Sequence, residues 1–251
     1  MKSNRRRAAL TIWVFSVLLA GLSAGCGPHR LAPAGTVQTV VQVRPEAVLD
    51  HAPKAEAFAP VFIIDGAGSP HNRIGKVSAR YTQEGKEELY IDPEIPVVYA
   101  GSYGFHTEKA AYRNLVYRIH FPKVPFSLIP FHLTAGSNPG ILVVITLDAQ
   151  DTPLLVTTVH TCGCYLAILP TSNLSPDAFP KGWAAAGGPI HVYGETLPRL
   201  LDFSNIPNPR LMIRFRADVH RVMALRVVPD SAVSSQNGFS ILPAALLPIS
   251  V

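Results

Sequence analysis

The sequence predicts a mainly β protein, either a β-sandwich or an open barrel with one or two short helices. All 23 prolines lie beyond residue 26, and proline at that density breaks long helices and marks turns between short strands. Short apolar segments recur between Gly and Pro, and several alternate with polar residues as half-buried strands do. The apolar content of 48% is too high for a disordered chain.

The first expected strand covers residues 36–43 (TVQTVVQV), in which Val37, Thr39, Val41 and Val43 share one face. Residues 44–60 fit either a loop or a further piece of tether. Strand signals become dense from residue 61, and we expect strands at 61–65 (VFIID), 76–83 (KVSARYTQ) and 88–93 (ELYIDP).

The clearest alternation lies in residues 115–121 (LVYRIHF). One face holds Leu115, Tyr117, Ile119 and Phe121, and the other face holds Arg118 and His120. The next strand signal is 126–133 (FSLIPFHL). Residues 140–147 (GILVVITL) form a nearly continuous β-branched run, which predicts a strand buried on both faces.

Further strands are expected at 154–160, 164–169, 210–215 and 219–228, and short helices at 175–186 and 194–203. Residues 100–104 (AGSYG) are similar to a nucleophile elbow, but Ala100 stands where that motif needs Gly. A Ser-Gly-rich stretch of this kind predicts a turn.

The N-terminus has the order of a secretory signal. Lys2 and Arg5, Arg6 and Arg7 precede the uncharged apolar residues 10–22, and small residues then lead to Cys26. This ending resembles the lipobox of bacterial lipoprotein precursors, although Ser23 stands at the usual Leu position and Leu22 one step earlier. The resemblance covers residues 1–26 only and implies cleavage before Cys26, which is then acylated.

The resemblance implies a signal peptide at 1–25, an acylated cysteine and tether at 26–35 (to 60 in the longer alternative), and one β-rich domain at 36–251. The expected location is the cell envelope, and Gly27 favours the outer membrane, facing the periplasm, in a Gram-negative host. Cleavage removes four of the 22 Lys and Arg and none of the 17 Asp and Glu, so the formal net charge falls from +5 to +1. The mature chain therefore lacks the basic surface that nucleic-acid binding needs.

Both remaining cysteines lie in His160-Thr161-Cys162-Gly163-Cys164. In a regular strand His160, Cys162 and Cys164 share one face, with positions 160 and 164 about 13 Å apart, so Gly163 would have to bend the chain. Three interpretations stay open: a strained and reducible Cys162–Cys164 disulfide, a structural pair of thiols with a core histidine, or a metal site. The last would bind Zn or Cu(I), with a fourth ligand from His220, His120 or His132.

Arg214, Arg216, His220 and Arg221 form a local basic set, which is typical of a solvated face or of a contact with acidic lipid or glycan. No specific catalytic constellation is found. The sequence favours a non-catalytic binding or assembly module, anchored to the membrane through Cys26 and able to contact other envelope proteins. The alternative is a metal-binding or thiol-redox protein that uses His160, Cys162, Cys164 and His220.

Overall fold

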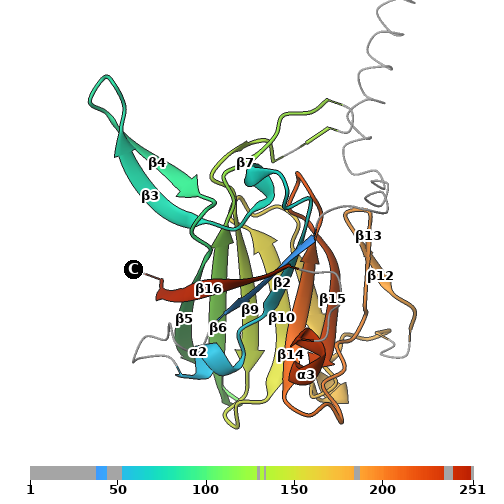
Figure 1. Cartoon of the computed structure of the whole chain (residues 1–251). Helices are drawn as coiled ribbons and strands as arrows, with labels where there is room; N and C mark the ends of the chain where they lie inside the picture. Colours follow the sequence, from blue (N-terminus) through green and yellow to red (C-terminus); the bar gives the residue numbers. More distant parts are fainter. Residues whose placement is uncertain are drawn as a thin grey trace, which may run out of the picture.

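The computed structural model describes residues 38–43, 53–128, 131–132, 134–183, 187–234 and 240–249. Within them, ten strands form one mixed sheet in the order β11-β10-β9-β6-β5-β16-β1-β2-β14-β15, and three two-stranded ribbons lie outside it. The described part of the chain has two short α-helices, so the mainly β class predicted from the sequence is confirmed (Figure 1).

The main sheet consists of β1 (Gln38–Val43), β2 (Val61–Asp65), β5 (Val97–His106), β6 (Ala111–His120), β9 (Gly140–Leu147), β10 (Pro153–His160), β11 (Ala167–Pro170), β14 (Pro209–Phe215), β15 (Val222–Pro229) and β16 (Ser240–Pro248). The ribbons are β3 (Lys76–Tyr81) with β4 (Glu87–Asp92), β7 (Lys123–Val124) with β8 (Gly136–Ser137), and β12 (Ile190–Val192) with β13 (Glu195–Leu197). The helices are α2 (Pro53–Ala57) and α3 (Asp230–Ser234), with 3₁₀ turns η3 (Pro70–Asn72) and η4 (Pro176–Ala178).

Strand β16 joins the two halves of the sheet. Its first residues pair in parallel with β1, and its last residues, from Ala245, pair in parallel with β5. The sheet curls at this strand, so that its two halves face each other across the core (Figure 1). The edge strands β11 and β15 do not pair, which makes the arrangement β-sandwich-like and not a closed barrel.

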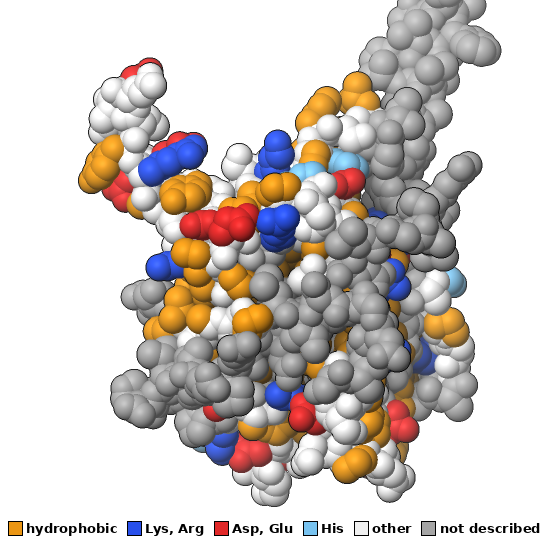
Figure 2. Space-filling model, viewed as in Figure 1, with side chains coloured by type: hydrophobic (Ala, Val, Ile, Leu, Met, Phe, Trp, Pro, Cys, Tyr) orange, Lys and Arg blue, Asp and Glu red, His pale blue; other side chains and the backbone are white. Residues whose placement is uncertain are grey.

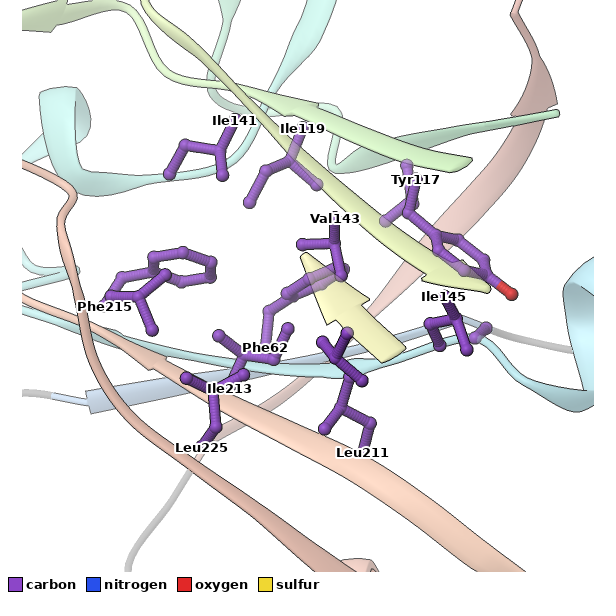
Figure 3. Close-up of a cluster of buried hydrophobic side chains, with 14 of the residues drawn as sticks. Phe62, Tyr117, Ile119, Ile141, Val143, Ile145, Leu211, Ile213, Phe215 and Leu225 are labelled. Carbon is purple, nitrogen blue, oxygen red and sulfur yellow. The ribbon is translucent and has the colours of Figure 1, made fainter. Parts of the chain in front are cut away.

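The core lies between these two halves (Figure 3). Ile119 and Val143 come from one half, and Phe62, Ile213 and Phe215 come from the other, all at 0% exposure. The rings of Phe62 and Phe215 lie 6.0 Å apart. Full burial of each such side chain contributes about 1.5–3 kcal/mol, so this interface is the main source of stability.

One end of the sandwich gathers most of the irregular structure. Asp65 at the end of β2 pairs with Gln38, at the start of β1, and β6, β10 and β14 end at the same side with His120, His160 and Phe215. We call this the upper end. The β3–β4 hairpin projects from it, and β7 lies beside η3 (Figure 1).

Several predicted strands are confirmed, and two are corrected. Apolar residues from Leu115 to Phe121 share the buried face as expected. Strand β9 alternates between buried and partly exposed residues, so burial on both faces is wrong; the outward face is only partly covered. Residues 126–133 form no regular strand in their described part but a single bridge between Leu128 and Phe131.

Both predicted helices are wrong. In the described part of 175–186 only the 3₁₀ turn η4 forms, since Pro180 cannot continue a helix. Residues 194–203 contain β13, which pairs with β12 in a small ribbon. The turn expected at 100–104 is also wrong, because β5 runs through it.

The signal peptide, Cys26 and residues 27–37 lie outside the described residues, as do residues 44–52 of the alternative tether at 44–60. Residues 53–60 of that alternative are described: they include α2, whose Ala55 is fully buried, so this part packs against the domain. Among the helices of the described segments, none has the length and apolar character needed to cross a membrane.

Candidate functional site

Strand β10 ends in a tight turn that carries Cys162 and Cys164. The His160 backbone N–H donates to the Cys164 carbonyl oxygen (2.9 Å), and the Gly163 N–H donates to the His160 carbonyl oxygen (2.8 Å). Gly163 has a φ of +84°, a conformation that glycine adopts without strain. This turn replaces the extended strand, so Gly163 bends the chain as its position predicted.

The turn presents two thiols that differ in exposure. Cys162 is exposed and Cys164 is half-buried, and both are free. A hydrogen bond with Cys162, together with burial, raises the pKa of the Cys164 thiol. Because its pKa is raised, the Cys164 thiol stays protonated at neutral pH. The reactive form of a cysteine is the thiolate. A cavity of about 440 Å³ lies beside the turn, bounded by His160, both cysteines and the segment Thr134–Gly140.

The two histidines of the predicted site lie behind the turn, in the core. His160 Nε2 donates to the His220 carbonyl oxygen (3.2 Å), and His220 Nε2 donates to Asn72 Oδ1 (3.1 Å). The His220 ring stacks on Phe121 at 3.9 Å. Burial lowers the pKa of His160 to about 4 and the pKa of His220 well below its usual value, so both rings are neutral at pH 7.

The predicted metal site is only partly assembled. The described residues contain no group of three or more His, Cys, Asp or Glu side chains placed to hold a metal ion. His160 lines the cavity together with both thiols. His220 is directed towards Asn72, and the alternative ligand His132 donates through Nδ1 to the Pro125 carbonyl oxygen (2.7 Å). The Zn or Cu(I) site stays a prediction, and it would require these rings to turn.

The interpretation of the basic set as a solvated face is wrong. Arg216 and Arg221 are buried, and both bind the buried Glu195, at 2.6–2.9 Å. Arg214 binds the buried Asp65 through two hydrogen bonds of 2.9 and 3.0 Å. These arginines are paired with carboxylates inside the fold. The turn at residues 216–221 packs against the β12–β13 ribbon, which carries Glu195. The sequence had predicted a helix at Glu195.

The charge balance at Glu195 is favourable despite burial. Burial alone would raise its pKa, but the hydrogen bonds and charges of Arg216 and Arg221 outweigh that effect and hold the pKa below its usual value. Glu195 is therefore ionised at neutral pH. The guanidinium of Arg221 also lies over the Tyr165 ring at 5.6 Å, which connects this ion-pair cluster to the cysteine turn.

A second cavity, of about 330 Å³, lies under the β3–β4 hairpin at the upper end. Its apolar lining includes Val77, Leu89 and Ile91 from the hairpin and Ile249 after β16, and Arg118 and His120 of β6 also line it. Figure 2 shows hydrophobic side chains on the hairpin and on the flank of the body immediately below it. We call this cavity the hairpin pocket.

Arg118 is unusual in this pocket. Among the described residues, the other arginines have a side-chain hydrogen bond or ion pair, whereas Arg118 has neither, and its Nε is buried without a partner. His120, the third alternative metal ligand, is buried beside it with an unpartnered Nδ1. Burial and the nearby Arg118 charge lower the pKa of His120 to about 4.

Sequence reasoning missed the hairpin pocket, although one signal for it existed. The alternation in 115–121 correctly placed Arg118 and His120 on the same face. The pattern could not show that a hairpin formed some 30 residues earlier covers that face.

Comparisons of this chain with protein-family models, with curated proteins and with solved structures each gave no match.

Proposed function

We propose that this protein is a membrane-anchored envelope lipoprotein whose β domain is a non-catalytic binding module. Support comes from the signal ending at Cys26 and from one structural observation: apolar side chains are exposed at the end where the described chain begins. The chain between Cys26 and Gln38 spans at most about 40 Å. An acylated Cys26 would therefore keep the upper end close to the bilayer.

The exposed apolar side chains belong to the loop after β7. Phe126 and Leu128 are 73% and 68% exposed. In the described part of this loop, a bridge joins Leu128 and Phe131, and the His132 N–H donates to the Ser127 carbonyl oxygen (3.0 Å). The sequence from 121 to 140 contains no Asp or Glu. Such a loop suits contact with the interfacial region of a membrane.

The energetic gain from this contact is substantial. Full burial of one large apolar side chain is worth about 1.5–3 kcal/mol, so Phe126 and Leu128 together would orient a domain that its lipid already holds at the surface. A binding module with its upper end against the bilayer would offer both cavities to molecules in or near the membrane.

The test has two parts, both on the full chain processed by a bacterial host. Mass spectrometry of the mature N-terminal peptide decides whether Cys26 is acylated. Phe126→Trp protein is then placed in vesicles that contain a brominated phosphatidylcholine, which quenches nearby indoles. Tyr103→Trp, at an exposed position on β5 away from the upper end, is the matched control, and the native Trp183 signal is subtracted.

We expect an acylated Cys26 and strong quenching of the Phe126→Trp signal, with little quenching of the Tyr103→Trp signal. An unmodified Cys26 would overturn the anchoring. A Phe126→Trp emission that is blue-shifted but not quenched would mean that another protein or a second copy covers the loop, and the proposed orientation would be wrong.

A second candidate function is thiol redox chemistry at the cysteine turn. Two thiols that hydrogen-bond to each other beside a cavity favour it. In this reaction the pair would lose two electrons and two protons to a disulfide of a partner protein and become a Cys162–Cys164 disulfide, strained by its short ring and therefore easily reduced.

Alkylation of free thiols before and after reduction, on protein isolated from the envelope, tests this candidate. A redox function predicts a mixture of dithiol and disulfide that shifts with the applied potential. Cys162→Ser protein, which retains only Cys164, is the control. Two thiols that alkylate fully at every potential would remove the redox function.

A further inference from the structure

The hairpin pocket has the composition of a site for an amphiphile. Its walls are apolar side chains from β3, β4 and the end of β16, including Val77, Leu89, Ile91 and Ile249. Its two basic side chains lie together on β6, where Arg118 and His120 share one face. No acidic side chain is among the described residues that line it, so this part of the chain combines an apolar wall with a positive charge that none of the described lining residues neutralises.

The position of Arg118 is costly in the absence of a ligand. A buried donor without a hydrogen-bond partner loses about 1–3 kcal/mol, and more when the group is charged. Three other arginines avoid this cost, since Arg214, Arg216 and Arg221 all bind buried carboxylates. An unsatisfied Nε in one arginine of such a well-paired set calls for a specific explanation.

We propose that the hairpin pocket binds an amphiphile with a single carboxylate on one short apolar chain. Arg118 binds the carboxylate, and the hairpin residues enclose the chain. This proposal names the ligand of the binding module proposed above. The proposal rests on that function in one respect: the membrane is the place where such ligands occur.

The chemistry of the lining selects this class. A guanidinium matches a carboxylate through two parallel N–H donors, and the Arg118 side chain that lines the pocket carries such donors. His120 is neutral at pH 7 and adds no second charge. The volume of about 330 Å³ is near the lower limit of about 300–1,000 Å³ for ligand pockets, which suits one short chain and excludes a whole two-chain lipid.

The hairpin is held in place as a wall of the pocket. The Val77 backbone N–H donates to the Tyr99 hydroxyl oxygen (2.9 Å), and the Asn138 side chain donates to the Leu89 carbonyl oxygen (2.9 Å). Tyr99 and Asn138 belong to the body of the domain and also line the pocket. These two bonds fix both strands of the hairpin over Arg118.

Binding of octanoate tests the proposal, with octanol as the uncharged equivalent, octylamine as the cation and acetate as the anion without a chain. The protein is the mature full chain from the host, in lipid nanodiscs when it is acylated, and the measurement is calorimetric titration. Octanoate partitions into lipid equally for every variant, so differences between variants report the pocket.

We expect octanoate to bind at least about 10-fold more tightly than octanol, and acetate and octylamine not to bind. Arg118→Gln should weaken octanoate binding about 10- to 100-fold and leave octanol binding unchanged. Arg118→Lys should weaken it less, because it retains the charge but loses the paired donors. Arg113→Gln, on the same strand but bonded to Ser102, is the matched control and should bind like the wild type.

A second variant tests the apolar wall independently of Arg118. Leu89→Ala should weaken octanoate and octanol alike by several-fold, while Tyr81→Ala, at the 77% exposed tip of the same hairpin, should change neither. Thermal unfolding of each variant confirms that it is folded.

Three results would overturn the proposal: no octanoate binding to the wild type, equal affinity for octanoate and octanol, or unchanged octanoate binding in Arg118→Gln. These results are separate from the anchoring test. A protein with acylated Cys26 that ignores octanoate contradicts the pocket proposal alone, and an unacylated protein that binds octanoate through Arg118 contradicts the anchoring alone.

Discussion

Two regions at the upper end contain arginine with buried guanidinium nitrogen, the whole side chain at Arg216 and Arg221 but only Nε at Arg118, and they differ in what surrounds it. Arg216 and Arg221 share the carboxylate of Glu195 at 2.6–2.9 Å, with all three side chains less than a tenth exposed. Arg118 lies against apolar walls in the hairpin pocket with no carboxylate and an unpartnered Nε. The first arrangement is complete within the fold, and the second becomes complete only when an anion binds.

The difference shows how an arginine that stabilises the fold can be distinguished from an arginine that binds a ligand. In the Glu195 cluster, removal of one partner leaves buried charge without a partner. In the hairpin pocket, the cost of the unpaired group is already present in the folded protein. Substitutions in the two regions should therefore have opposite consequences for stability and for binding.

The largest expected effect is at Glu195. Glu195→Gln leaves two buried guanidinium groups beside an uncharged side chain, and we expect a loss of about 3–5 kcal/mol of unfolding free energy. Denaturant titration measures it. Glu88→Gln, which removes an exposed partner of Arg80, should cost less than about 1 kcal/mol. If the Glu195 variant were as stable as the Glu88 variant, water would reach the Glu195 cluster, and the contrast between the two regions would be wrong.

The next effect is the pH dependence contributed by His160. The folded protein keeps this ring neutral down to a pKa of about 4, while the unfolded chain takes up a proton below about 6.5. Stability is therefore lost as pH falls from 6.5 to 4, by roughly 3 kcal/mol for this ring. His160→Gln should lose less stability than the wild type over that range; parallel curves for the two proteins would contradict the burial of a neutral His160.

Asp65 gives an intermediate case. Its carboxylate is buried, but its partner Arg214 is 36% exposed, so water can solvate the arginine once the carboxylate charge is gone. We expect Asp65→Asn to cost about 1–3 kcal/mol, less than the change at Glu195. Thermal and denaturant unfolding of the two variants side by side check the order, and a reversed order would show that exposure of the remaining arginine does not set the cost.

The smallest effect on stability is expected at Arg118. Arg118→Gln removes an unpaired donor whose cost the folded protein already carries, so the unfolding free energy should not fall in the absence of ligand and should rise by about 0–1 kcal/mol. With saturating octanoate the wild type should gain stability and the variant should not, because only the form that binds ligand is stabilised. A large loss of unfolding free energy without ligand would mean that Arg118 stabilises the fold, as Arg216 and Arg221 do.

Much of the fold could be predicted from the sequence because alternation is a local signal. The buried face of Leu115–Phe121 and the strand at 61–65 follow directly from residue spacing. Strand β16 could not be predicted, since Pro243 and Pro248 argue against a strand in the middle of a sheet and its pairing with β1 and β5 depends on residues distant in sequence.

The candidate sites were predictable only in part, for the same reason. The bend at Gly163 follows from its neighbours, whereas the fate of the arginines depends on long-range contacts. Arg216 and Arg221 are neutralised by Glu195, some 20 residues away and expected in a helix. Arg118 is enclosed by a hairpin that no local pattern relates to it, so its separation from the carboxylates of the described residues appears only in three dimensions.

Nitrogen-15 NMR of arginine Nε–H groups in the mature protein, recorded while octanoate is added, tests the contrast most directly. Spectra of Arg118→Gln and Glu195→Gln proteins assign the signals. We predict that the Arg118 Nε–H signal shifts with octanoate and saturates, while the signals of Arg216 and Arg221 stay in place. An Arg118 signal that does not respond, or one that responds no more than those of the paired arginines, would contradict the account.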